Sequence, residues 1–161
     1  MLLKPDQHYG VARPEQVAGL TGRQMLQAML DGALPAPPIC RTLNIILAEI
    51  GDGFAAFEGD PSEAVLNPLG TVHGGWALTL VDSATGCAAQ TTLPAGVLYT
   101  TVETKANFSR PIFPHTGRVR CEARVINAGR QIISCDATLK GPDGKLLGHG
   151  TSTLMVLPGR G

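Results

Sequence analysis

The sequence predicts an α+β domain in which an antiparallel β-sheet curls around one long buried helix. The helix is predicted over Trp76–Gln90, a stretch with no proline and one glycine that is too long for an ordinary strand. Apolar side chains occur on all of its sides, and a helix of that kind is normally buried. Strand patterns with turn residues between them occur on both sides of this helix in the chain. A curved sheet that encloses the helix is the simplest arrangement of these parts.

Six segments are predicted to form the strands. Two lie within residues 43–58, with Gly51-Asp52-Gly53 as the turn between them. The other four follow the helix: Val97–Arg110, Arg118–Asn127, Gln131–Lys140 and Lys145–Leu157. Arg118–Asn127 alternates charged and apolar residues, as a strand half exposed to water does. Asn127-Ala128-Gly129 and Gly141-Pro142-Asp143-Gly144 are predicted to be the hairpin turns.

The sequence is divided into a helical extension (residues 1–42), the main domain (43–157) and a short C-terminal tail (158–161). The first 20 residues are predicted to be irregular. Thr21 is then the expected N-cap of a helix, with Gln24 in the spacing of a capping box. One face of this helix is apolar and needs burial somewhere; it carries Met25, Leu26, Met29 and Leu30.

Composition limits the functions that are open to the chain. Its 161 residues suffice for one domain with a hydrophobic core. Only 16% of them are charged, below the usual quarter, which suits a protein that buries surface in an oligomer. Lys+Arg and Asp+Glu number 13 each, so the net charge is zero. A neutral chain argues against nucleic acid or an anionic membrane as the main partner.

The cysteines indicate a cellular location. Cys40, Cys87, Cys121 and Cys135 form no Cys-x-x-Cys pair and have no histidine at metal-ligand spacing. They are predicted to be free thiols in a reducing cytoplasm. No apolar run reaches membrane-spanning length, and the N-terminus does not have the pattern of a signal peptide, so a cytoplasmic protein is expected.

The start of the predicted helix carries groups suited to chemistry. Gly74-Gly75 would leave backbone N–H groups uncovered at the positive end of the helix, where an anion or a polarised carbonyl oxygen can bind. Asp82 supplies an acid, base or nucleophile among apolar neighbours. These two positions are eight residues apart, about 12 Å along a helix. One small substrate group cannot contact both within one chain, so we expect a site shared across a symmetric dimer.

The pattern of these residues resembles one enzyme family. Asn67-x-x-Gly70-x-x-His73-Gly74-Gly75, an acid nine residues after the histidine, and the strand Thr101–Pro111 together look like the hotdog-fold acyl-CoA thioesterases of the PaaI (phenylacetic acid degradation) type. The likeness covers about residues 43–157. It implies a hotdog fold, a homodimer that often pairs into a homotetramer, and hydrolysis of an acyl-CoA without a metal or organic cofactor.

The resemblance also implies roles for individual residues. The Gly74 N–H would bind the thioester carbonyl oxygen, Asp82 of the partner subunit would attack the thioester or activate water, and Thr101 would help to hold that water. Asn67 would position the nucleophile or water, and His73 would order the loop that presents Gly74. The residues that would meet the substrate or its CoA portion are Gly75, Phe108, Arg110, Asn127, Gly129, Arg130 and Gln131.

Several alternatives stay open on the sequence alone. Asp82 could be a structural acid bonded to a neighbouring hydroxyl, His73 could simply cap the turn, and Thr100 could take the place of Thr101 after a register slip of one residue. The acyl group could be aromatic, short or medium-chain. The rival functions are an acyl-CoA hydratase or dehydratase on the same fold, and a non-catalytic protein that binds acyl-CoA or an aromatic ligand.

Overall fold

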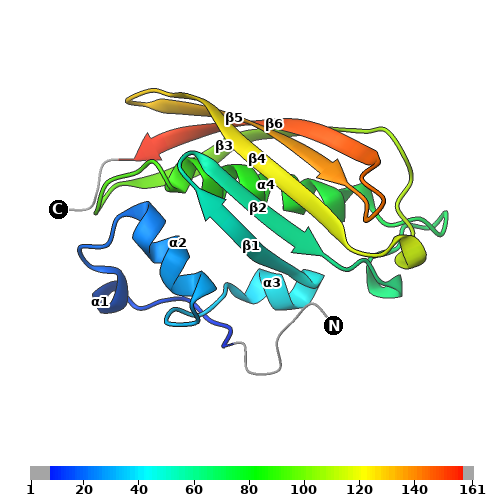
Figure 1. Ribbon diagram of the computed structural model, residues 1–161, viewed down its shortest axis with the longest axis horizontal. Helices are drawn as coiled ribbons and strands as arrows, with labels where there is room; N and C mark the ends of the chain where they lie inside the picture. Colours follow the sequence, from blue (N-terminus) through cyan, green and yellow to red (C-terminus); the bar gives the residue numbers. More distant parts are fainter. Residues whose placement is uncertain (1–7, 158–161) are drawn as a thin grey trace.

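A computed structural model describes residues 8–157, which form one curved sheet around a central helix. The sheet is antiparallel, with strand order β1-β2-β4-β5-β6-β3. Its strands are β1 (Ile45–Gly51), β2 (Phe54–Gly59), β3 (Leu98–Phe108), β4 (Val119–Ala128), β5 (Ile132–Lys140) and β6 (Leu146–Leu157). The central helix α4 (Gly74–Gln90) runs along the concave face of the sheet (Figure 1). The predicted α+β class and all six predicted strands are therefore confirmed.

Helix α4 forms where its sequence predicts it and is the centre of the hydrophobic core. Nine of its residues are buried, from Trp76 to Ala89, and they pack against inward-facing side chains of the strands. Trp76 is 3% exposed, and its indole N–H donates to the Leu43 carbonyl at 2.8 Å. Trp76 is thus a core residue. One stripe of α4 is only half-buried and contains Thr79, Asp82, Ser83, Cys87 and Gln90.

Strand β3 forms one edge of the sheet and contains an irregularity that affects the site. Its pairing with β6 shifts between Thr101 and Glu103, so Val102 is an extra residue. A β-bulge of this kind changes which side chains face inward beyond it. The other edge of β3 pairs with no strand among residues 8–157. Three apolar side chains of β3 are each about half exposed: Leu98, Val102 and Phe108.

The N-terminal segment packs against β1, at the edge of the sheet opposite β3, and against α4 (Figure 1). It contains α1 (Pro14–Val17), α2 (Gly22–Leu30) and α3 (Pro38–Leu43). Thr21 caps α2 and forms the predicted capping box with Gln24. The expectation of irregular structure before residue 20 is wrong for α1, and α3 was not expected. Both helices have a proline at the first turn, where its missing N–H has no helical partner to lose.

Helix α2 is fixed to the end of α4 by a close backbone contact. The Gly22 N–H donates to the Leu93 carbonyl at 3.0 Å, and Leu26 is 2% exposed. The apolar stripe of α2 therefore packs against β1 and α4, where Leu26 is buried and Met25, Met29 and Leu30 are half-buried. No helix of residues 8–157 has the length and apolar character needed to cross a membrane. The predicted C-terminal tail, 158–161, lies outside the described residues.

Candidate active site

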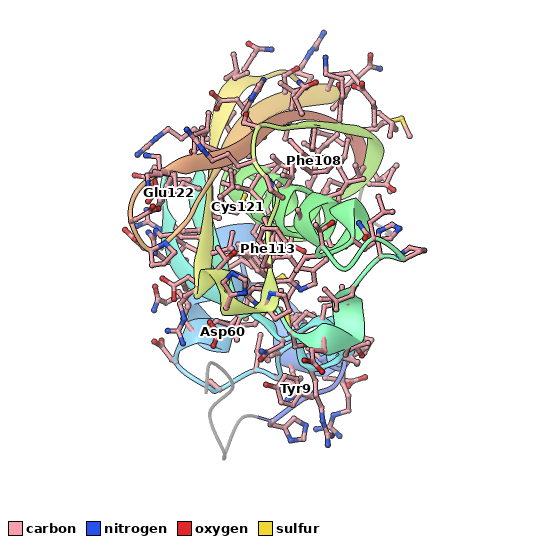
Figure 2. All side chains as sticks on the ribbon, turned by 90° about the vertical axis from the view of Figure 1, so that its right-hand side faces the viewer. Tyr9, Asp60, Phe108, Phe113, Cys121 and Glu122 are labelled. Carbon is pink, nitrogen blue, oxygen red and sulfur yellow. The ribbon has the colours of Figure 1, made fainter. Side chains whose placement is uncertain are left out.

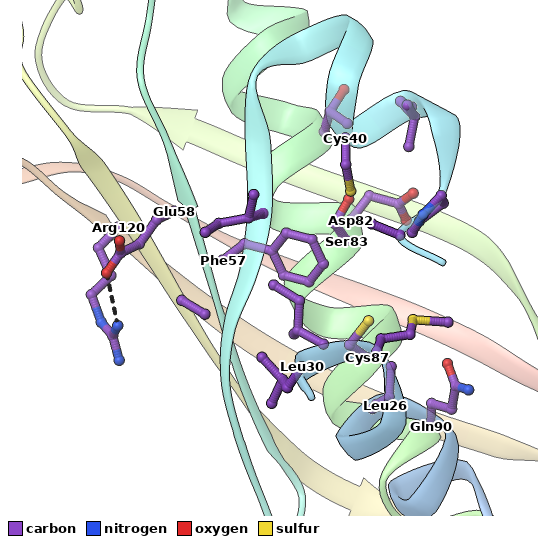
Figure 3. A pocket seen from close by; sticks show the side chains of 18 of the residues that line it. Leu26, Leu30, Cys40, Phe57, Glu58, Asp82, Ser83, Cys87, Gln90 and Arg120 are labelled. Atoms are coloured by element: carbon purple, nitrogen blue, oxygen red, sulfur yellow. Dashed lines mark hydrogen bonds and ion pairs between the residues drawn. The ribbon is translucent and has the colours of Figure 1, made fainter. Parts of the chain in front are cut away.

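The larger of two cavities beside α4 has a volume of about 710 Å³, and Asp82 is one of the residues that line it. Its walls come from α2, α3, β1, β3 and the half-buried stripe of α4. Figure 3 shows Asp82 and Ser83 near Cys40, and Cys87, Leu26, Leu30 and Gln90 further along the helix. The lining is mostly apolar, as is usual for small-molecule sites, and its polar side chains include Thr79, Asp82, Ser83, Gln90 and Thr101. Sequence reasoning did not find the part of this wall that α2 and α3 supply.

The Asp82 carboxylate has one oxygen fixed and one free. Its Oδ1 accepts a hydrogen bond from the Thr104 hydroxyl at 3.0 Å. Among residues 8–157 no hydrogen bond reaches its Oδ2. The two hydroxyls considered from the sequence as structural partners, Thr79 and Ser83, do not bond it; Thr79 donates to the Gly75 carbonyl instead. The carboxylate thus keeps a free oxygen next to the cavity, which a general base or nucleophile requires.

The bulge in β3 explains why two threonines face Asp82. Thr101 lies opposite Leu154 and Thr104 lies opposite Ser152, and both of these β6 residues are buried. In a regular strand, residues three apart point to opposite faces. The extra residue Val102 shifts the alternation of side chains by one position, so Thr101 and Thr104 both point inward. Thr101, not the exposed Thr100, lines the cavity. Thr104 is a site residue that the sequence did not reveal, because no pattern marks the bulge.

The titratable groups around Asp82 are mostly kept neutral by burial. Burial raises the pKa of the Cys87 thiol to about 12 and that of Cys40 to about 11. It also raises the pKa of Tyr99 far above its usual value. Arg120 is the one cation that lines the cavity within residues 8–157, and it is bonded to Glu49, Glu58 and Glu122. Figure 3 shows it on the other side of the strands from Asp82.

A second cavity, of about 300 Å³, lies at the N-terminus of α4. Four of the predicted site residues line it: Asn67, Gly74, Phe108 and Arg110. A Cβ at Gly74 would lie 2.9 Å from the Phe108 ring, so the glycine allows this close approach. Figure 2 looks toward this end of the molecule, with Phe108 beside α4.

The first turn of α4 leaves one N–H group available. His73 is the N-cap, and its Nδ1 accepts from the Gly75 N–H at 2.9 Å. The hydrogen bonds of residues 8–157 include none from the Gly74 N–H. Asn67 organises the preceding loop: its Oδ1 accepts from the Leu69 N–H at 2.9 Å, and its Nδ2 donates to the Thr71 hydroxyl at 2.7 Å. Both His73 and Asn67 hold the loop before Gly74.

A single chain does not bring all of the predicted site residues together. Gly74 and Asp82 line different cavities. The β4–β5 hairpin, with Asn127, Gly129, Arg130 and Gln131, lies at the other end of the sheet from Phe108 and Arg110. Ile132 and Thr100 both lie opposite Met155, whereas Phe108 lies opposite Gly148. The eight residues from Thr100 to Phe108 span roughly 27 Å at about 3.4 Å per residue.

The separation also affects the arginines of the predicted CoA site. Arg130 is exposed in the hairpin loop, and Arg110 is exposed next to the second cavity. Arg110 donates to the Leu146 carbonyl at 2.7 Å.

No group of three His, Cys, Asp or Glu side chains within residues 8–157 is arranged to hold a metal ion.

Comparison with known proteins identifies the family. Residues 69–147, from the loop before α4 to the beginning of β6, match the family model described as the thioesterase superfamily. A phenylacetic acid degradation-related protein from Ralstonia eutropha JMP134 is 30% identical to this chain. The match covers 81% of this chain and 98% of that one, with a TM-score of 0.73. The chain belongs to the thioesterase superfamily.

The six-stranded sheet around α4 is accordingly the hotdog fold of the thioesterase superfamily. A thioesterase family protein from Silicibacter pomeroyi is 30% identical over 76% of this chain and 90% of its own, with a TM-score of 0.69. The phenylacetic acid degradation protein PaaI from Thermus thermophilus is 26% identical over 73% of this chain and 97% of its own, with a TM-score of 0.66. The family and fold that the sequence motif indicated are confirmed.

Proposed function

We propose that this protein hydrolyses an acyl-CoA thioester, giving a free carboxylic acid and CoA. The observation that carries the proposal is the Asp82 carboxylate, which has one fixed and one free oxygen beside a mostly apolar cavity. Asp82 either takes a proton from the attacking water or attacks the carbonyl carbon itself. In both cases the C–S bond breaks, the thiolate leaves and is protonated, and water supplies the new oxygen of the acid.

The Gly74 N–H is the proposed donor to the thioester carbonyl oxygen. It lies at the positive end of α4 and has no acceptor among residues 8–157. A hydrogen bond there stabilises the negative charge that develops on the oxygen as the carbonyl is attacked. His73 and Asn67 support this role by ordering the loop and capping the helix.

The complete site is proposed to contain two chains. Gly74 and Asp82 of one chain lie about 12 Å apart along α4, in different cavities. The unpaired edge of β3 offers a surface on which a second copy can add its own β3 in antiparallel pairing. Such pairing reverses one chain relative to the other, so the hairpin of one chain comes to the Phe108 end of its partner. Thr101 and Gly75 then belong to the walls of a shared site.

The shape of the larger cavity supports an apolar acyl group. It extends along α4 from Thr79 to Gln90, about 17 Å by helical rise. Leu26, Met29 and Leu30 line the part that α2 covers. We therefore propose an aromatic or medium-chain acyl group there, with the CoA portion outside, near Phe108, Arg110 and the β4–β5 hairpin.

A panel of acyl-CoAs of different chain length, with release of free thiol as the readout, tests the function. Asp82→Asn is expected to lower kcat/KM at least about 100-fold, the usual contribution of a general base. Asp136→Asn, at an exposed acid on β5, is the matched control and is expected to keep the native rate.

Three results would contradict the proposal in different ways. Equal rates for Asp82→Asn and the native protein would remove Asp82 from the mechanism. Water addition to an enoyl-CoA without thiol release would indicate a hydratase. Saturable binding of acyl-CoA by calorimetry, with no product at all, would indicate a binding protein.

A further inference from the structure

Three hydroxyl groups form a chain that leads from the core to Asp82. The Thr85 hydroxyl lies 2.8 Å from the Ser152 hydroxyl, which lies 2.9 Å from the Thr104 hydroxyl. Thr104 in turn donates to Asp82 Oδ1 at 3.0 Å. Thr85 is fully buried and Ser152 is 2% exposed. Two polar side chains in such a position require hydrogen-bond partners, and they find them in this chain.

The direction of these hydrogen bonds follows from counting protons. An ionised carboxylate only accepts, and each hydroxyl has one proton to donate. The Thr104 proton therefore goes to Asp82, so Ser152 donates to Thr104, and Ser152 can then only accept from Thr85. Thr85 also lies 2.9 Å from the Val81 carbonyl, its alternative acceptor. With Thr85 donating to Ser152, every contact between the three hydroxyls carries a proton.

We propose that Thr104 is a positioning residue for Asp82, held in place by Ser152 and Thr85. Its hydroxyl fixes one oxygen of the carboxylate and leaves the other directed at the substrate. The inference rests on the proposed function, because it takes Asp82 to be the base or nucleophile. Thr104 itself touches no reacting atom.

The surroundings of Asp82 make this hydrogen bond important. Thr104 gives the one hydrogen bond that the Asp82 carboxylate accepts from residues 8–157. The titratable groups that share its cavity are Cys40 on α3, Cys87 on α4 and Tyr99 on β3, and burial keeps all three protonated. Arg120 and Glu58 also line the cavity, but they pair with each other beyond the strands (Figure 3). No cation therefore balances the carboxylate inside the described part of the cavity.

The β3 bulge is what makes the arrangement possible. Without the extra residue at Val102, Thr104 would point away from α4 and could not meet Ser152. Bulges are frequent next to active sites, where they redirect a side chain. The position of Thr104 is thus set by the backbone, and its hydroxyl is set by two buried partners.

Steady-state kinetics on Thr104→Val and Thr104→Ser, with kcat and KM measured separately, test the proposal. Valine keeps the shape of threonine but has no hydroxyl. Without the hydrogen bond to Oδ1 the Asp82 carboxylate is no longer held in one orientation, so kcat is expected to fall about 10-fold, with KM almost unchanged. Serine keeps the hydroxyl, so the kcat of Thr104→Ser is expected to stay within about 3-fold of native.

Two further variants complete the experiment. Thr151→Val, on the exposed face of β6 beside Ser152, controls for the general effect of a Thr-to-Val change in this sheet and is expected to keep the native kcat and KM. Ser152→Ala removes the group that orients Thr104 and is expected to lower kcat by a smaller factor, with KM almost unchanged. If Thr104→Val does not fold, Ser152→Ala tests the proposal in its place.

The outcomes separate this inference from the proposed function. An unchanged kcat in both Thr104→Val and Ser152→Ala, with Asp82→Asn inactive, overturns the role of Thr104 alone. A loss of thermal stability without a fall in kcat overturns it as well, since that result indicates a purely structural threonine. Native activity in Asp82→Asn removes Asp82 from the mechanism and the role of Thr104 with it, whereas no thiol release from any acyl-CoA by the native protein overturns the function itself.

Discussion

Gly22 is the residue on which the attachment of α2 depends most directly. It is buried at the first turn of α2, against the C-terminal end of α4. A Cβ built on Gly22 would lie 1.9 Å from the Gln90 carbonyl oxygen and 2.9 Å from its carbonyl carbon. Both are backbone atoms at the end of a helix, so a side-chain rotation cannot relieve the collision. In Gly22→Ala, α2 must move away by about 1.5 Å for this contact to reach the 3.4 Å of ordinary van der Waals packing.

The cost of that movement can be worked out from the contacts that it breaks. The Gly22–Leu93 backbone hydrogen bond, now 3.0 Å long, would be lost at a cost of about 1 kcal/mol. Leu26, 2% exposed in the native protein, would lose part of its burial, which is worth roughly 1.5–3 kcal/mol when complete. The higher helix propensity of alanine offsets about 1 kcal/mol at most. We expect a net loss of about 2 kcal/mol, or roughly 4–8 °C in Tm for a domain of this size.

Thermal and urea unfolding of the purified variants measure this loss. Gly10→Ala is the matched control, because a Cβ there would meet its nearest atom at 3.6 Å, an ordinary contact. It is expected to change the free energy of unfolding by less than about 0.5 kcal/mol. If Gly22→Ala unfolds at the same temperature as the native protein and Gly10→Ala, then α2 is not held against α4 as described.

Three further predictions concern the site. Asp82→Asn and Gly74→Pro chains are each expected to be inactive alone, but a mixed dimer should have about half the native activity, because one of its two shared sites is intact. Gly74→Ala, which keeps the N–H, is the control for Gly74→Pro. Mixtures as inactive as the separate chains would contradict shared sites. Met29→Trp should shorten the large cavity and lower the preference for long over short acyl chains, since each lost methylene contact is worth about 0.8 kcal/mol or roughly 4-fold in kcat/KM. Gln27→Trp, at an exposed position of α2, should leave the chain-length profile unchanged. An equal effect of the two variants would show that Met29 is not part of the wall of the acyl site. His73→Ala should lower the free energy of unfolding by about 1 kcal/mol through loss of the N-cap, whereas His73→Asn, which can still accept from Gly75, should retain most of it in urea unfolding.

Much of the fold was determined locally and could be predicted from the sequence. The apolar stretch after Gly74-Gly75 has helical length and no breaker, so α4 formed as expected. Glycine-rich turns placed the hairpins between β1 and β2 and between β5 and β6. Thr21 and Gln24 satisfied the first N–H groups of α2 in the expected way. Patterns of this kind act over three or four residues, which is why they are readable without coordinates.

The sequence also indicated part of the candidate site. The spacing of Gly74 and Asp82 along one helix predicts that they do not act together within one chain, and the structure places them in different cavities. The choice between Thr100 and Thr101 needed the register of β3 with β6. The catalytic roles of these residues remain predictions for the experiments above.

Only the tertiary structure decided how Asp82 is held and what covers the cavity. The bulge at Val102 depends on how β3 pairs with β6, and a strand's own sequence does not specify the register of its partner. Thr85, Ser152 and Thr104 come from three elements, so no local pattern joins them. The place where the apolar face of α2 is buried is equally non-local. The sequence alone determined the helix, the strands and the acid in the helix, because these follow from local preferences. The contacts around that acid follow from packing between distant segments.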